Sequence, residues 1–186
     1  MRNWHSPTGF WTRKQMPDVS LVEGRLSFEF KEVDFAEKYD DWEHYRNQYN
    51  SACGSSKGVD FVVLKDGEIW LIEIKDFRQH RRTKAIDLAD EIALKVRDTM
   101  AGLVSAKFLA RNCGEASASN AALSCKKLRV AFHLEQPSRP SRLFRVSVDP
   151  ANLQIKLRQR LRFADPHPQV FDRRRFPAQL GTVASV

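Results

Sequence analysis

Two apolar segments separated by a short polar turn form the clearest pattern in this chain. Residues 61–64 and 69–72 are wholly apolar, and Asp66-Gly67 lies between them. Segments that are apolar on both faces indicate buried strands. Asp-Gly favours a two-residue hairpin turn, because both positions accept a positive φ. The pattern therefore predicts a central β-hairpin that runs from about Asp60 to Lys75.

Weaker patterns on either side of this hairpin predict the remaining elements. Alternating apolar residues predict a half-buried strand at residues 26–33. Apolar residues at helical spacing predict a helix at 34–49, with Asp34 as its N-cap, and a long helix at 86–112. The order is completed by strands at 127–135 and 143–148 and a short basic helix at 152–163. This order predicts an α/β fold with a central mixed sheet flanked by helices.

The chain has 186 residues, a length that suits one domain with a substantial core. Three segments are expected to hold little regular structure: an N-terminal arm, a Ser/Ala-rich linker and a basic tail, at residues 1–20, 114–124 and 164–186. The net charge of +8 favours a polyanionic partner.

Neither a membrane partner nor a structural metal is expected. No apolar run is long enough to span a membrane, so a cytoplasmic protein is predicted. The three cysteines, Cys53, Cys113 and Cys125, lack the spacing of a zinc site and are predicted to be reduced thiols.

The predicted hairpin places two acidic residues opposite each other. If Asp66-Gly67 forms the turn, the Cβ atoms of Asp60 and Glu73 lie about 5 Å apart on one sheet face. Like charges in that position repel, and a divalent cation between them removes the repulsion. Lys75 projects from the same face, because side chains alternate along a strand. The pattern thus predicts a site for Mg²⁺, or Mn²⁺ in its place, beside a lysine suited to a phosphate.

The aspartate, the twelve residues after it and the Glu-x-Lys that follows resemble the motif of the PD-(D/E)xK nuclease superfamily. The likeness is nearest to the restriction and Holliday-junction-resolvase branches, because Gly58 shortly precedes Asp60, although Val59 replaces the proline of the motif. The resemblance implies a restriction-endonuclease-like core whose active site lies on the hairpin. It also implies that Asp60, Glu73 and the Ile74 carbonyl bind the metal and that Lys75 is catalytic.

A glutamate of the first helix often completes the metal site in this superfamily. Glu43 is the candidate here, with Glu37 and Asp41 behind it. Arg46 projects from the same predicted helix, where it either neutralises a carboxylate or reaches a phosphate.

A basic segment follows directly after the proposed catalytic lysine. Its position at the mouth of the site predicts contact with nucleic-acid phosphates, which arginine and lysine bind without reading sequence. The residues are Arg78, Arg81, Arg82 and Lys84.

Together these features predict a metal-dependent nuclease that acts in DNA processing or phage defence. The residues do not show whether the substrate is DNA or RNA, while the resemblance favours DNA. Because many relatives of this fold are dimers, a homodimer is possible. Two alternatives stay open: a nucleic-acid-binding module without catalysis, and a basic domain that binds an acidic protein. In the second alternative another group, such as Arg46, neutralises Asp60 and Glu73.

Overall fold

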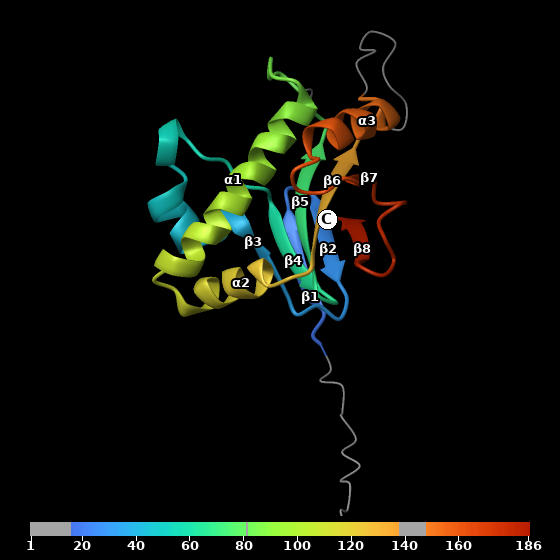
Figure 1. Cartoon of the computed structure of the whole chain (residues 1–186). Coiled ribbons are helices and arrows are strands. Elements are labelled where there is room, and N and C mark those ends of the chain that lie inside the picture. Colours follow the sequence, from blue (N-terminus) through green and yellow to red (C-terminus); the bar gives the residue numbers. More distant parts are fainter. Residues whose placement is uncertain (1–15, 81, 138–147) are drawn as a thin grey trace, which may run out of the picture.

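The structure is a computed structural model that describes residues 16–80, 82–137 and 148–186. It has three layers, in which helices cover one face of a five-stranded sheet and a three-stranded sheet covers the other (Figure 1). The large sheet has the order β3-β4-β5-β6-β7 and the small sheet the order β1-β2-β8. The prediction of an α/β fold with a mixed sheet is therefore confirmed.

The large sheet combines an antiparallel and a parallel half. Its strands are β3 (Phe35–Lys38), β4 (Phe61–Lys65), β5 (Glu68–Asp76), β6 (Lys127–Glu135) and β7 (Gln169–Phe171). Strands β3, β4 and β5 pair antiparallel, whereas β5, β6 and β7 pair parallel. The predicted hairpin is confirmed in its register, because Leu64 pairs with Ile69 and Lys65 with Glu68. Asp66 and Gly67 have the positive φ values, 51° and 72°, that such a turn requires.

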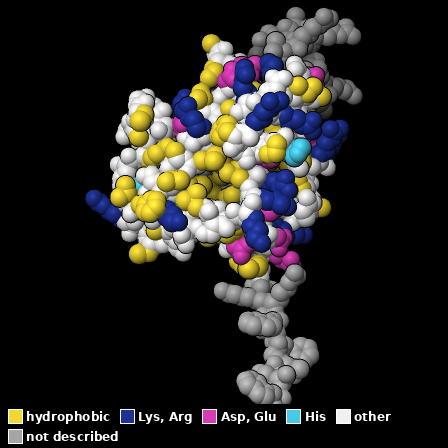
Figure 2. All heavy atoms as spheres, in the orientation of Figure 1, with side chains coloured by type: hydrophobic (Ala, Val, Ile, Leu, Met, Phe, Trp, Pro, Cys, Tyr) yellow, Lys and Arg dark blue, Asp and Glu magenta, His cyan; other side chains and the backbone are white. Residues whose placement is uncertain are grey.

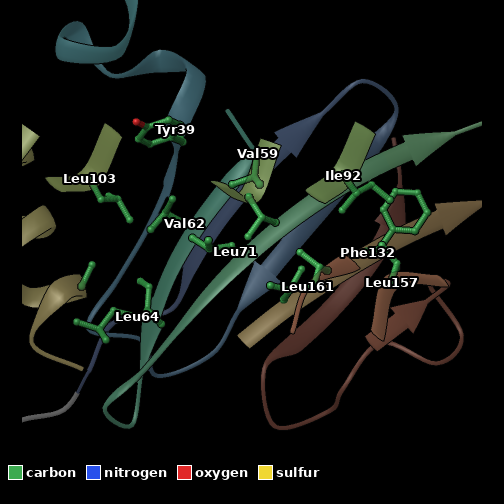
Figure 3. Close-up of a cluster of buried hydrophobic side chains, with 14 of the residues drawn as sticks. Tyr39, Val59, Val62, Leu64, Leu71, Ile92, Leu103, Phe132, Leu157 and Leu161 are labelled. Atoms are coloured by element: carbon green, nitrogen blue, oxygen red, sulfur yellow. The ribbon is translucent and has the colours of Figure 1, made fainter. Parts of the chain in front are cut away.

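Both faces of the hairpin are buried, as its composition predicts. Val62, Leu64 and Leu71 point toward the helices and belong to the core cluster drawn in Figure 3. Phe61, Val63 and Ile72, which alternate with them, belong to a second cluster between the two sheets. The site described below therefore lies on a strand that is packed from both sides.

The small sheet closes this second cluster. It contains β1 (Val19–Glu23), β2 (Leu26–Phe30) and β8 (Gly181–Ser185). Its central strand β2 buries Leu26, Phe28 and Phe30 completely and leaves the alternate positions outside, as the sequence pattern predicts.

Three α-helices form the outer layer: α1 (Leu88–Leu109), α2 (Cys113–Leu123) and α3 (Pro150–Arg160). Asp87 caps α1, since its side chain accepts a hydrogen bond from the Ala89 N–H at 2.8 Å. Helix α1 packs against both α2 and α3 and confirms the long helix predicted there. None of the helices in the described residues has the length and apolarity to cross a bilayer.

The predicted helix at residues 34–49 was wrong. The segment instead forms β3, a 3₁₀ turn (η1, Tyr39–Asp41) and a π-helical turn (η2, Tyr45–Tyr49). The edge of β4 determines this outcome, because the Asp34 N–H donates to the Leu64 carbonyl and the Tyr39 N–H to the Asp60 carbonyl. Strand pairing outweighs the helical spacing of the aromatic residues.

Two segments expected to hold little structure are ordered. All but the last of residues 114–124 lie in α2, which has Asn112 as N-cap and contains four alanines, the residue with the highest helix propensity. Residues 164–186 contain β7 and β8, which extend the two sheets. A further 3₁₀ turn, η3 (Ala52–Gly54), precedes β4. Most of the strand predicted at 143–148 lies outside the described residues, as does most of the predicted N-terminal arm.

Asp165, in the segment after α3, links that segment to strand β6 through hydrogen bonds. Its carboxylate is 1% exposed and accepts hydrogen bonds from the N–H groups of Val130 and His167, each at 2.8 Å. We expect Asp165→Ala to lower the free energy of unfolding by about 2 kcal/mol, because the buried Val130 N–H loses its acceptor. Urea denaturation measures the change, and Asp165→Asn, which keeps one acceptor oxygen, should lose less. Equal loss in the two variants would contradict this account.

Candidate functional site

Four charged side chains meet where the start of β4, the end of β5 and helix α1 come together. The Lys95 ammonium lies between two carboxylates, 2.7 Å from Glu73 Oε2 and 3.5 Å from Asp60 Oδ1. The Lys75 ammonium donates to Glu73 Oε1 and lies 3.3 Å from the Ile74 carbonyl oxygen. The structure thus brings Asp60, Glu73 and Lys75 together, as the sequence predicts, and adds Lys95.

Local backbone contacts fix the relative positions of these groups. The Ile74 N–H donates to Asp60 Oδ2 at 2.6 Å, which ties the start of β4 to β5. On the helix side, Thr99 Oγ1 accepts from the Val59 N–H at 2.9 Å and Asp98 Oδ2 accepts from the Lys57 N–H at 3.0 Å. Helix α1 is therefore attached to the segment that leads into Asp60, and this attachment places Lys95.

Burial and neighbouring charges shift the pKa values of Glu73 and Lys95. The Glu73 side chain is only 1% exposed. Burial and the neighbouring charge of Asp60 raise the pKa of Glu73 to about 7, against the opposing effect of the two lysines. Burial alone would lower the pKa of Lys95, but the charges of Glu73 and Asp60 outweigh it and raise that pKa.

This arrangement can bind a cation or an anionic group. Two carboxylates and the Ile74 carbonyl supply the oxygen ligands that Mg²⁺ prefers. The described residues hold no group of three or more His, Cys, Asp or Glu side chains that could bind a metal. Any metal here therefore depends on this short set of oxygens and on water.

Two candidates from the predicted first helix lie elsewhere. Glu43 is exposed, and its N–H donates to Glu115 Oε1 of α2 at 2.6 Å. Arg46 forms an ion pair with Asp41 and donates through Nε to the Asp40 carbonyl at 2.8 Å. The ion pair of Arg46 with Asp41 matches the carboxylate-neutralising role considered for it, although with a carboxylate other than Asp60 or Glu73.

The basic segment after β5 is largely engaged with acidic side chains. Arg78 forms a two-pronged ion pair with Asp76, through Nε to Oδ1 at 2.9 Å and Nη2 to Oδ2 at 2.6 Å. Arg82 and Lys84 both pair with the buried carboxylate of Glu91. Arg81 lies outside the described residues. These ion pairs neutralise part of the positive charge that was predicted to bind phosphates.

The sequence analysis did not include Lys95 in the site, although a signal for its position exists. Lys95 follows Ile92 by three residues and precedes Thr99 by four, and both neighbours are fully buried. Residues at this spacing share one helix face. A lysine inside a buried stripe requires a carboxylate partner, and that requirement points to Asp60 and Glu73.

A second basic area lies over α3 and the segment after β7. Figure 2 shows lysine and arginine side chains concentrated on the side of the molecule where Figure 1 places these elements. Lys156 and Arg160 of this area pair with Asp87 and Asp90 of α1. Arg158 and Arg162 are exposed and form no salt bridge within the described part of the chain.

The chain is similar to part of a much longer curated protein, a cysteine–tRNA ligase of Neisseria meningitidis serogroup A. The two sequences are 37% identical over 165 residues, which cover 73% of this chain and 24% of the ligase. The chain therefore spans about a quarter of the length of that relative. No family model matches the chain, and no solved structure matches it.

This similarity corrects the prediction made from the hairpin motif. The prediction of a metal-dependent nuclease in DNA processing or phage defence was wrong, because the similar curated protein is a tRNA ligase. The motif spacing predicts that Asp, Glu and Lys side chains lie close together. It does not distinguish a site that cleaves nucleic acid from one that uses the same three charges in another way.

Proposed function

We propose that this chain is a tRNA-binding module that works with an aminoacyl-tRNA ligase. The observation that carries the proposal is the 37% identity to a segment of a cysteine–tRNA ligase, an enzyme whose name states that it acts on tRNA. A segment of about a quarter of that enzyme has the size of one appended domain. The activation and transfer chemistry is therefore assigned to the remainder of the ligase, and binding to this chain.

The charge distribution supports a ribonucleic acid as the partner. The chain has 31 lysines and arginines against 23 acidic residues. Arg158 in the last turn of α3 and Arg162 just after the helix, which together we call the α3 basic surface, are exposed, whereas Leu153 and Leu157 of the helix face the core. Exposed arginines on a rigid helix bind phosphates and orient a helical RNA without reading its sequence.

The finer fold proposed here is a restriction-endonuclease-like core used for binding. Supporting it are the antiparallel β3-β4-β5 unit, the connection through α1, and the return of β6 parallel to β5. The position of Asp60 directly before β4, and of Glu73 and Lys75 on β5, agrees with the resemblance noted in the sequence. On this proposal the core holds an RNA backbone and does not cut it.

A divalent cation, Mg²⁺ or Mn²⁺, is proposed to bind at Asp60, Glu73 and the Ile74 carbonyl. The position between the two carboxylates is held by the Lys95 ammonium, which supports a preference for positive charge there. A bound cation would supply positive charge for an RNA phosphate oxygen. The Lys75 ammonium, 23% exposed at its side chain, would donate to the same phosphate.

The test is salt-dependent binding of purified chain to cysteine tRNA, another tRNA and duplex DNA of similar length, measured by fluorescence anisotropy. We expect tRNA to bind more tightly than DNA, with log affinity falling linearly with log salt. The double variant Arg158→Ala/Arg162→Ala should reduce the salt slope by about 2.

The matched control is Arg111→Ala/Lys126→Ala, which removes the same charge from exposed positions away from α3. If the control pair weakens tRNA binding as much as the α3 pair, net charge and not this surface drives binding. Duplex DNA binding as tight as tRNA binding would overturn the proposal.

A further inference from the structure

A cavity of about 500 Å³ lies where the three parallel strands of the large sheet end. Strands β5, β6 and β7 run parallel, and the residues that follow each of them line this cavity: Arg78, Gln136 and Arg173–Arg175. The carboxyl ends of parallel strands are the usual place for ligands in open α/β sheets. We call this cavity the carboxyl-end pocket.

Four arginines line the pocket against two carboxylates, those of Glu135 and Asp172, so its lining carries a net positive charge. The guanidinium groups of Arg78 and Arg173 both donate through Nη1 to the hydroxyl of Ser185, at 2.8 and 2.7 Å. Two like charges that share one neutral acceptor repel each other, and the carboxylates of Asp76 and Glu135 offset part of that repulsion at Arg78. An anion beside Arg173 would offset more of it.

The segment after β7 is fixed in a shape that presents two more arginines. Asp172 Oδ1 accepts from the N–H groups of Arg174 and Arg175, each at 2.9 Å. The Arg173 N–H donates to the buried carboxylate of Glu135 at 2.8 Å. These bonds engage the backbone and leave the Arg174 and Arg175 side chains exposed at the rim of the pocket. The backbone of the site therefore loses little conformational entropy when a ligand binds.

The pocket also offers an apolar aromatic surface beside the arginines. Phe171 lines it and is half-buried, with its ring centroid 6.2 Å from that of Phe176. Aromatic side chains stack on nucleobases of any identity, and guanidinium groups bind phosphate oxygens through two hydrogen bonds. The cavity volume lies within the range of pockets that bury small ligands.

We infer that the carboxyl-end pocket binds a single nucleotide, with its phosphate at Arg173 and Arg174 and its base against Phe171. The nucleotide is either the phosphorylated end of an RNA chain or a free nucleoside monophosphate, and RNA as the source rests on the proposed function. The residues assigned to this site belong neither to the α3 basic surface nor to the Asp60–Glu73 group, so variants of each can be made separately.

The test is isothermal titration calorimetry of the whole chain with AMP, with adenosine and with inorganic phosphate, each in a separate titration. AMP should bind more tightly than adenosine and than phosphate, because only AMP occupies both the arginines and Phe171. Arg174→Gln should weaken AMP about tenfold by removing one charged contact. Phe171→Leu should weaken the binding of AMP and leave the affinity for phosphate unchanged. A general loss of the fold would weaken the binding of both. Arg111→Gln, an exposed arginine outside the pocket, is the matched control.

Short RNA oligonucleotides with and without a terminal phosphate separate the two sources. Tighter binding of the phosphorylated RNA, lost in Arg174→Gln, assigns the pocket to an RNA end. AMP binding without such a preference assigns it to a free nucleotide. If neither AMP nor phosphate binds, the inference is overturned, while tRNA binding through Arg158 and Arg162 can persist. If AMP binds and tRNA does not, the proposed function fails and the pocket stands.

Discussion

Replacing Lys95 with methionine is expected to lower the free energy of unfolding by about 3–5 kcal/mol at neutral pH. The Lys95 ammonium lies 2.7 Å from Glu73 Oε2, and the Glu73 side chain is 1% exposed. Methionine keeps the length of the side chain and removes its charge, so two carboxylates then face each other with Lys75 alone to compensate them. Breaking a buried ion pair from one side is costly because the remaining charge stays buried.

Urea denaturation measures this loss, and Lys107→Met is the matched control, since it removes an exposed lysine from the same helix. The loss should shrink in acid. Burial raises the folded-state pKa of Glu73 to about 7 from its ordinary 4.5, so a falling pH protonates this carboxyl first in the folded state and removes the repulsion. A variant as stable as Lys107→Met would contradict the ion-pair network.

The same variant tests the proposed cation site. Mg²⁺ and the Lys95 ammonium would compete for the same oxygens, so Mg²⁺ at about 10 mM should stabilise Lys95→Met more than the unmodified chain. Equal stabilisation of both proteins would count against a cation at Asp60 and Glu73. It would leave the ion pairs themselves unaffected.

Gly181→Ala is expected to lower the free energy of unfolding by about 3 kcal/mol or more. Gly181 has a φ of +151°, which side chains rarely adopt, and a Cβ there would lie 1.9 Å from the carbonyl oxygen of Glu29. That oxygen belongs to the backbone of β2, so the clash cannot be relieved by turning a side chain. The alanine would therefore separate β8 from β2, which pairs Phe30 with Gly181.

Gly24→Ala provides the comparison for this second variant. Gly24 also has a positive φ, +56°, but a Cβ there meets no atom within 4 Å. It should cost only about 1–2 kcal/mol, from backbone conformation alone. Thermal denaturation followed by circular dichroism measures both variants, and similar losses would show that the contact with Glu29 is unimportant.

The sequence predicts those parts of the fold that local chemistry determines. The Asp66-Gly67 turn fixes the register of the hairpin, and that register brings Asp60, Glu73 and Lys75 together. The stripe of aromatic residues around Tyr39 misled the prediction of a helix, because pairing with β4 depends on residues more than twenty positions away. The segment that forms α2 was predicted to be a linker because its serines and alanines suggested a loop, although Asn112 before it is a typical N-cap residue.

The carboxyl-end pocket could not be predicted in this way. Its arginines follow three strands that are distant in sequence, and only the parallel pairing of β5, β6 and β7 collects them. The function could not be predicted from the motif either, because the same three charged residues can equally well bind a cation, bind a phosphate or form ion pairs with each other. The similarity to a tRNA ligase supplied information that no spacing of residues contains.

The pairing of β2 with β8 has a consequence for how the chain folds during synthesis. Strand β2 leaves the ribosome before its partner β8, which meets Phe30 at Gly181 and is made about 150 residues later. Until then Phe28 and Phe30, fully buried in the finished protein, lack one side of their sheet. Contacts of such long range slow folding and expose apolar surface to other chains. The nascent chain therefore depends on β8 to protect β2.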